Sequence, residues 1–163
     1  MGKSKQIILP DRYHLVPRSL TFIINQDEIL LLKGSPDKKI WAGLYNGIGG
    51  HIERGENVLE AAKRELFEET GIQKVNLTLR ANILIDVEEN QGISLFVFLG
   101  KTTIKTTKSS SEGEIEWIKI NELANYPLVE DLHQLIPRII SEVDNIIFGR
   151  YFYHNDNLIM QFT

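Results

Sequence analysis

Three glutamates stand close together in the chain, with Glu65 followed by Glu68 and Glu69. On a helix, residues three and four positions apart are neighbours, so these carboxylates would gather on one side. Like charges at this spacing repel one another, which weakens an isolated helix. A hard cation reverses that repulsion, because carboxylate oxygens are the ligands that Mg²⁺ prefers, with waters and substrate phosphates completing its shell. The cluster therefore indicates either a metal site for phosphate chemistry or a solvated acidic face.

The residues around this cluster favour the metal site. Arg64 can offset part of the repulsion through a contact with Glu68, one turn away on the helix. Upstream, Gly49 and Gly50 have no side chains, so backbone carbonyls and amides there can approach a metal ion and phosphates closely. Adjacent glutamates alone would favour the solvated face. A glycine pair, several charged positions and a helix stop at fixed spacing favour the metal site instead.

Residues 57–70 form the helix that has to carry these side chains. Asn57 can cap the helix, Glu60 stands three residues on as its capping-box partner, and Gly71 is a natural stop. An apolar stripe, separate from the carboxylates, can bury against a sheet. It consists of Leu59, Ala62 and Leu66.

The other elements predict a mixed sheet with two main helices. Residues 20–33 form two apolar runs around a Gln-Asp pair, which predicts a hairpin, and residues 34–45 form a loop. A second helix is expected over 128–143, kinked or divided by Pro137. The Thr/Ser/Lys-rich stretch 102–111 is expected to be a mobile loop. Further strands are expected at 77–87, 93–101 and 115–120, with a closing hairpin of 146–152 and 158–162 around His-Asn-Asp-Asn.

The spacing of the charged segment resembles the Nudix box. Read from Gly50, five residues lead to Glu56, and seven more lead to the run Arg-Glu-Leu-Phe-Glu-Glu-Thr-Gly-Ile at 64–72. This matches the family motif at every defining position. The resemblance implies the α/β class, as a Nudix α/β/α sandwich with a mixed β-sheet between helices and a loop–helix–loop catalytic motif. It also implies an enzyme that hydrolyses a diphosphate linkage with Mg²⁺, with Mn²⁺ as a substitute.

The resemblance also implies roles for single residues. Arg64 would orient the carboxylates, and Glu65 is the preferred base for activating water, with Glu68 beside it. An acidic residue outside the box is the alternative base, and Glu112 is preferred over Glu114, although a solvated loop is an equal interpretation of both. The implied metal ligands are Gly50, Glu56, Glu65, Glu68 and Glu69.

A second resemblance concerns the substrate. Tyr-Asn-Gly-Ile-Gly-Gly at 45–50 is similar to the Trp-Asn-Gly-Phe-Gly-Gly of the MutT-like oxidised-purine nucleoside triphosphate diphosphatases. In that branch the asparagine binds the base, and a pair of aspartates reads the purine edge where Glu130 and Asp131 stand here. The closing hairpin is similar as well. The implied substrate-binding residues are Asn46, Gly49, Trp117, Glu130 and Asp131.

Each of these base-binding assignments has a structural alternative. Asn46 could be a turn residue, and the Glu-Asp pair could simply begin a helix, where acidic residues suit the dipole. The aromatic candidates for stacking could all be core residues; they are Trp117, Tyr45 and Phe22. The chain departs from the branch at Glu130, Tyr45 and His51, where Asp, Trp and often Lys are found.

Composition excludes several classes of protein. Residues 1–163 are expected to form one domain, and without cysteine the chain has no disulfide, no Cys-ligated zinc and no thiol nucleophile. A net charge of −4 argues against a nucleic-acid polymer as partner, but not against a small nucleotide bound through metal. No apolar run is long enough for a membrane span. A cytoplasmic protein with no membrane partner is expected, as a monomer or a homodimer.

Three functions remain in competition. The first is hydrolysis of an oxidised purine nucleoside triphosphate such as 8-oxo-dGTP to the monophosphate and pyrophosphate, which would sanitise the nucleotide pool. The second is hydrolysis of another diphosphate, such as ADP-ribose or a dinucleotide polyphosphate. The third is a Nudix-like ligand sensor without catalysis, which the intact box glutamates disfavour.

Overall fold

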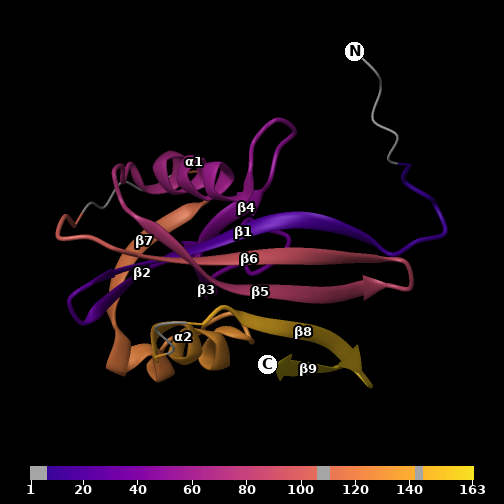
Figure 1. The fold of residues 1–163 in the computed structure, drawn as a ribbon. Coiled ribbons are helices and arrows are strands. Elements are labelled where there is room, and N and C mark those ends of the chain that lie inside the picture. Colours follow the sequence, from indigo (N-terminus) through magenta and orange to yellow (C-terminus); the bar gives the residue numbers. More distant parts are fainter. Residues whose placement is uncertain (1–6, 106–110, 142–144) are drawn as a thin grey trace, which may run out of the picture.

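The structure is a computed structural model that describes residues 7–105, 111–141 and 145–163. A mixed sheet lies at its centre, with one helix on each side (Figure 1). This arrangement confirms the α/β/α sandwich. The strands are β1 His14–Asn25, β2 Glu28–Gly34, β3 Tyr45–Asn46, β4 Ile48–His51, β5 Leu77–Glu88, β6 Gln91–Lys101, β7 Gly113–Lys119, β8 Ile147–His154 and β9 Asn157–Phe162; the helices are α1 Val58–Thr70, the 3₁₀ helix η1 Ile120–Asn125 and α2 Leu132–Ser141.

The predicted box helix is confirmed in α1. The Asn57 side chain accepts hydrogen bonds from the backbone N–H groups of Leu59 and Glu60, and the Glu60 carboxylate accepts one from Asn57 N at 2.8 Å. Gly71 ends the helix with φ 74°, a left-handed conformation that glycine adopts at no steric cost. These caps fix where α1 begins and ends.

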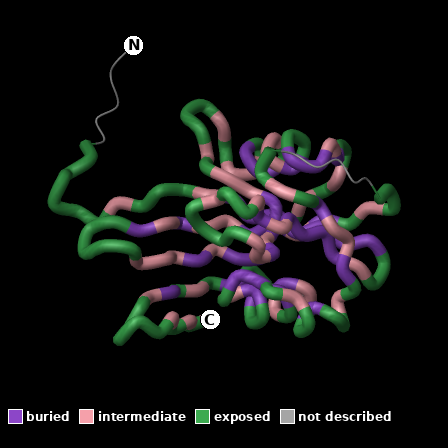
Figure 2. The backbone as a smooth tube through the Cα atoms, turned by 180° about the vertical axis from the view of Figure 1, so that it is seen from behind, coloured by how far each residue is buried: buried purple, intermediate pink, exposed green. Residues whose placement is uncertain are grey.

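Alternation along the first hairpin divides the core into two layers. Ile23 and Leu30 face α1 and pack with Leu66, whereas Phe22 and Ile29 face the α2 side. Successive side chains of a strand point to opposite faces, so a strand buried on both faces reads as a continuous apolar run. The buried segments of Figure 2 follow these central strands and the inner sides of the helices.

Strand pairing brings distant parts of the chain to β1. The order of the main sheet is β3-β2-β1-β6-β5-β8-β9, with β4 added to β1 and β7 added to β2. β1 pairs parallel with β6, and β5 pairs parallel with β8. The remaining ladders are antiparallel, so the sheet is mixed, as predicted. β4, which carries the glycine pair, lies between β1 and α1 in Figure 1.

The second helix starts later than expected. Residues 128–131 were predicted to be helical, but the backbone of Tyr45 hydrogen-bonds to Pro127 and Val129, which holds this stretch extended. The helix therefore begins at Leu132, immediately after Asp131, whose carbonyl accepts the first helical bonds. Pro137 lies inside α2 without dividing it. The predicted end at residues 142–143 lies outside the described residues.

The remaining predictions hold with small shifts. Both hairpins are present; the first turns at Gln26-Asp27 and the second at Asn155 and Asp156, which have φ 50° and 62°. The strand predicted at 115–120 starts two residues earlier, and Ile120 begins η1. Of the loop 102–111, residues 106–110 lie outside the described part. Among the described helices, none has the length and apolar character needed to cross a membrane.

Candidate active site

The glycine pair on β4 lies directly against β1 and α1. Gly50 pairs with Ser19 and Gly49 with Leu20 in the β1–β4 ladder. A Cβ atom at Gly49 would collide with the Ser19 carbonyl, and one at Gly50 would collide with the Glu65 carboxylate. At Gly49 the colliding atom is backbone, so only glycine permits this approach to β1, and at Gly50 a side chain would displace the Glu65 carboxylate.

Arg64 gathers three of the predicted carboxylates. Its Nε and Nη2 donate to both oxygens of Glu56 at 3.0 and 2.7 Å. Its Nη1 lies 2.8 Å from Glu65 Oε1 and 3.3 Å from Glu68 Oε2, and Nη2 also donates to the His51 carbonyl. The hydrogen bonds from Arg64 are the main reason why the pKa of Glu56 falls to about 2. The predicted orienting role of Arg64 agrees with this geometry.

Glu69 differs from the other carboxylates because it is buried. It is 5% exposed, and its Oε2 has no hydrogen-bond partner in the structure. Burial, together with the negative charges of Glu65 and Glu112, raises its pKa to about 8. Lys38, which forms an ion pair with Glu112, offsets part of this effect. A buried carboxyl with an unpaired oxygen is costly unless a cation or donor binds there.

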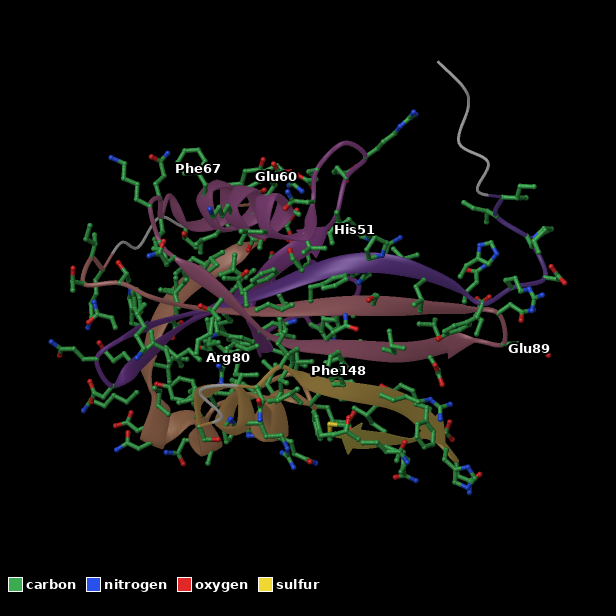
Figure 3. All side chains as sticks on the ribbon, viewed as in Figure 1. His51, Glu60, Phe67, Arg80, Glu89 and Phe148 are labelled. Carbon is green, nitrogen blue, oxygen red and sulfur yellow. The ribbon has the colours of Figure 1, made fainter. Side chains whose placement is uncertain are left out.

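These side chains open into a cavity of about 470 Å³, which we call the acidic cavity. It lies between β4 and the carboxylate side of α1, and Figure 3 shows His51 at the end of β4, below the loop that leads into α1. Phe67 and Glu60 project from the outer side of α1, away from the cavity (Figure 3). The acidic cavity is lined by Glu65, Glu68, Glu69, Glu112 and Glu53, together with Gly49, Gly50, His51, Ser111 and Arg18.

The acidic cavity has the donor set of a divalent metal site. Within the described ranges, no three acidic or histidine side chains converge closely enough to hold a metal ion. Arg64 accounts for this, because it draws Glu65 and Glu68 toward itself. The unpaired buried oxygen of Glu69 and the further carboxylates beside it nevertheless fit a hard cation, which prefers oxygen ligands. A metal bound here would compete with Arg64 for Glu65 and Glu68.

A second cavity of about 380 Å³ adjoins the first, and we call it the apolar cavity. It lies on the α2 side of the sheet, and both cavities share Arg18, Gly49 and Gly50. Its walls are mainly apolar, with a few polar groups, which is the usual character of a small-molecule site. The apolar lining includes Leu20, Trp41, Ile85, Leu95, Tyr153 and Leu158.

Three polar groups face the apolar cavity together. Asn46 Oδ1 accepts from Gly47 N at 2.8 Å, so Asn46 shapes the turn and also lines the cavity. Burial raises the pKa of Asp131 to about 6. Tyr151 is 2% exposed, and burial followed by the negative charge of Asp131 raises the pKa of its hydroxyl. The interaction also acts on Asp131, since Tyr151 lowers the pKa of that carboxyl and offsets part of the effect of burial.

The structure brings most of the predicted site residues to the two cavities. Asn46, Glu130 and Asp131 line the apolar cavity. Of the predicted metal ligands, Gly50, Glu65, Glu68 and Glu69 line the acidic cavity. Glu56 is held by Arg64 and does not line either cavity, so as a metal ligand it would have to leave that pair.

The aromatic candidates for base stacking lie elsewhere. Trp117, predicted to bind substrate, packs on the α1 side of the sheet with Ile115, because the alternation of β7 turns it away from the apolar cavity. Tyr45 is buried and donates to Glu116 at 2.9 Å, and Phe22 is fully buried in the core. For these three residues the core interpretation fits the structure.

Sequence reasoning missed Arg18, Trp41 and Tyr153 as lining residues. Trp41 is 46% exposed and has φ 61°, an unusual conformation for a bulky residue. The apolar Ile40-Trp41 pair, directly after the charged Asp37-Lys38-Lys39 tip of the loop, was the available signal for Trp41. Arg18 and Tyr153 reach the cavity through strand pairings that no local pattern reveals.

Comparison with known proteins places the chain in a family. Residues 15–139 match the model of the NUDIX domain. The oxidized purine nucleoside triphosphate hydrolase of Mus musculus is 23% identical over 146 residues, which cover 89% of this chain and 91% of the relative. The structure of a MutT mutator protein from Bacillus halodurans is 26% identical with a TM-score of 0.77, covering 91% of this chain and 97% of that chain.

A further solved structure shares the fold alone. The NUDIX domain of Shewanella oneidensis NrtR, complexed with ADP ribose, has a TM-score of 0.65 at 16% identity and covers 77% of this chain and 86% of that chain. The family match covers most of the chain, and the box carboxylates Glu65, Glu68 and Glu69 stand at one cavity beside a second, mainly apolar one. The chain belongs to the Nudix family and is a hydrolase of nucleoside diphosphate derivatives.

Proposed function

We propose that this enzyme hydrolyses oxidised purine nucleoside triphosphates, such as 8-oxo-dGTP, to the nucleoside monophosphate and pyrophosphate. The observation that carries the proposal is the pair of adjoining cavities, one acidic and one apolar, joined at Gly49 and Gly50. Such a shape suits a substrate with a flat apolar base at one end and phosphates at the other. The similarity to the mouse oxidized purine nucleoside triphosphate hydrolase and to the MutT structure supports the same substrate class.

The polar groups of the apolar cavity suit an oxidised purine. Oxidation at C8 converts N7 of guanine from a hydrogen-bond acceptor into a donor and adds a carbonyl oxygen. The Asp131 carboxylate can accept from such an N7–H group, and the Asn46 carboxamide can donate to a carbonyl. An unmodified guanine would leave Asp131 without a donor, and a buried acceptor left unpaired disfavours the wrong base strongly.

The acidic cavity supplies the hydrolytic groups. A divalent metal, preferably Mg²⁺, would be held by Glu69, Glu65 and Glu68, and when bound it neutralises charge on the diphosphate. Glu65 takes a proton from the attacking water, and Arg64 positions Glu65 through its 2.8 Å bond. Water forms a new bond to phosphorus while the bond to the bridging oxygen between the α- and β-phosphates breaks. We place this activity in the cytoplasm, on free nucleotides and not on a nucleic-acid polymer.

A substrate panel tests the proposal directly. With Mg²⁺, 8-oxo-dGTP is expected to give monophosphate and pyrophosphate with a kcat/KM at least roughly tenfold above that of dGTP, equivalent to about 1.4 kcal/mol. The panel includes 2-hydroxy-dATP, ADP-ribose and diadenosine tetraphosphate, and product analysis by chromatography identifies the bond that is cut. A preference for ADP-ribose or the dinucleotide would refute the oxidised-purine assignment. Absence of turnover on every substrate would favour the ligand sensor.

Asp131→Asn tests recognition of the base. The amide presents both a donor and an acceptor, so the ratio of kcat/KM for 8-oxo-dGTP over dGTP is expected to fall about 10- to 100-fold. In the wild-type enzyme this ratio should rise with pH through about 6, because protonated Asp131 can donate its O–H to N7 of unmodified guanine, whereas the ionised carboxylate can only accept. Steady-state kinetics between pH 5 and 8 measure both effects. An unchanged ratio in Asp131→Asn would show that another group reads the base.

A further inference from the structure

Arg18 occupies the junction between the two cavities. It lies on β1, opposite His51 of β4 and beside Leu95 of β6. Its side chain lines the acidic cavity and the apolar cavity alike. Any molecule that fills both cavities at once has to pass this guanidinium.

The Arg18 side chain has unused hydrogen-bonding capacity. Its Nε is buried and has no hydrogen-bond partner in the structure. None of the ion pairs found among the described residues involves Arg18, although five glutamates line the acidic cavity with it. Arg64, by contrast, uses its donors on Glu56, Glu65 and Glu68. A buried donor without a partner is costly, so a ligand that pairs with it gains affinity.

The chemistry of that ligand follows from the two neighbours of Arg18. A guanidinium presents N–H donors in a planar fork that matches the oxygens of a phosphate or a carboxylate. The substrate phosphates at the acidic cavity face mainly carboxylates, which repel them, so a cation at the entrance is favourable. With the base in the apolar cavity and the outer phosphates in the acidic one, the phosphate nearest to the nucleoside stands at the junction.

We propose that Arg18 binds the substrate phosphate nearest to the nucleoside and keeps that contact in the nucleoside monophosphate product. This inference rests on the proposed function, since it assumes a nucleotide that spans both cavities. Arg18 is then a binding residue that touches substrate, and it ties the position of the base to that of the reacting diphosphate. Its positive charge attracts the phosphate, which the negatively charged glutamates of the acidic cavity repel.

The test compares each nucleoside with its own monophosphate by calorimetry, with Mg²⁺ present. Two pairs are used: 8-oxo-deoxyguanosine with 8-oxo-dGMP, and adenosine with AMP. In the wild-type protein the monophosphate of at least one pair is expected to bind at least about tenfold more tightly than the nucleoside. In Arg18→Gln this advantage should shrink at least about tenfold, while the Kd of the nucleoside stays within a factor of about two. Arg18→Lys keeps the charge without the fork and should retain an intermediate advantage.

Controls separate this inference from the substrate assignment. Arg54→Gln removes one charge from an exposed residue that lines neither cavity, and it should leave both affinities unchanged. Equal binding of the oxidised and adenosine pairs would refute the oxidised-purine assignment but would leave the proposed role of Arg18 unaffected. A phosphate advantage that survives in Arg18→Gln, or none in the wild type, would overturn the role of Arg18. A loss of nucleoside affinity equal to that of the monophosphate would also overturn it, by showing a purely structural effect.

Discussion

Glu65→Gln is expected to lower kcat for the preferred nucleoside triphosphate at least about 10³-fold. The amide cannot take a proton from water, and it is a poorer ligand for a divalent cation, so two contributions disappear together. Glu65 also lies 2.8 Å from Arg64, and its carboxylate fills the space left open at Gly50. Steady-state kinetics with Mg²⁺, followed by product analysis, measure the loss.

Glu89→Gln is the matched control for this change. Glu89 lies at the turn between β5 and β6, far from α1 (Figure 3), so the same loss of charge there should leave kcat within about twofold. The melting temperature of Glu65→Gln should stay close to that of the wild type, because Arg64 keeps both of its hydrogen bonds to Glu56 when the ion pair with Glu65 is lost. If Glu65→Gln kept more than about a tenth of wild-type kcat, the base would have to be sought outside the box, first at Glu112.

Glu69→Gln is expected to stabilise the metal-free protein at alkaline pH. The pKa of Glu69 is raised from 4.5 to about 8, mainly by burial, so folding favours the protonated form. The contribution of protonated Glu69 to the unfolding free energy is therefore fully present below about pH 4.5, and it is lost as the pH rises to about 8. Each pH unit in this window costs about 1.4 kcal/mol. Ionisation of Glu69 therefore lowers the unfolding free energy of the wild type by about 4 to 5 kcal/mol across the window. Glutamine does not ionise, so the variant avoids the loss.

Urea unfolding in EDTA at pH 5 and pH 9 measures this difference. The two proteins should have similar unfolding free energies at pH 5, and Glu69→Gln should be the more stable one at pH 9. Addition of Mg²⁺ at pH 9 should stabilise the wild type and have little effect on the variant, because a bound metal compensates the ionised carboxylate. Identical pH dependence of the two proteins in EDTA would mean that Glu69 is not the buried titrating group.

Local sequence signals were sufficient to predict the elements whose ends depend on residues nearby in the chain. The cap at Asn57 and the stop at Gly71 fix α1, and turn residues fix both hairpins. The box carboxylates could be predicted as one cluster, because helical spacing alone brings Glu65, Glu68 and Glu69 together.

Features that depend on distant pairings could not be predicted in this way. The start of α2 was misplaced because Tyr45, which is distant in the sequence, holds Val129 extended through backbone hydrogen bonds. Trp117 faces α1 because of the register of β7 with β2, which composition does not encode. Arg18 joins the two cavities only through the pairing of β1 with β4 and β6. The acidic residues of the candidate site could therefore be predicted as a cluster, whereas the shape of the two cavities could not.

The position of β1 also affects how the protein is made. β1 leaves the ribosome well before its parallel partner β6, since His14 pairs with Gln91 and Ile24 with Lys101. Until β6 has been synthesised, one edge of β1 and part of its apolar surface stay uncovered. Uncovered strand edges invite pairing with other chains, and nonlocal parallel pairing is slow. Recovery of soluble enzyme should therefore depend on translation speed and on chaperones that shield this edge.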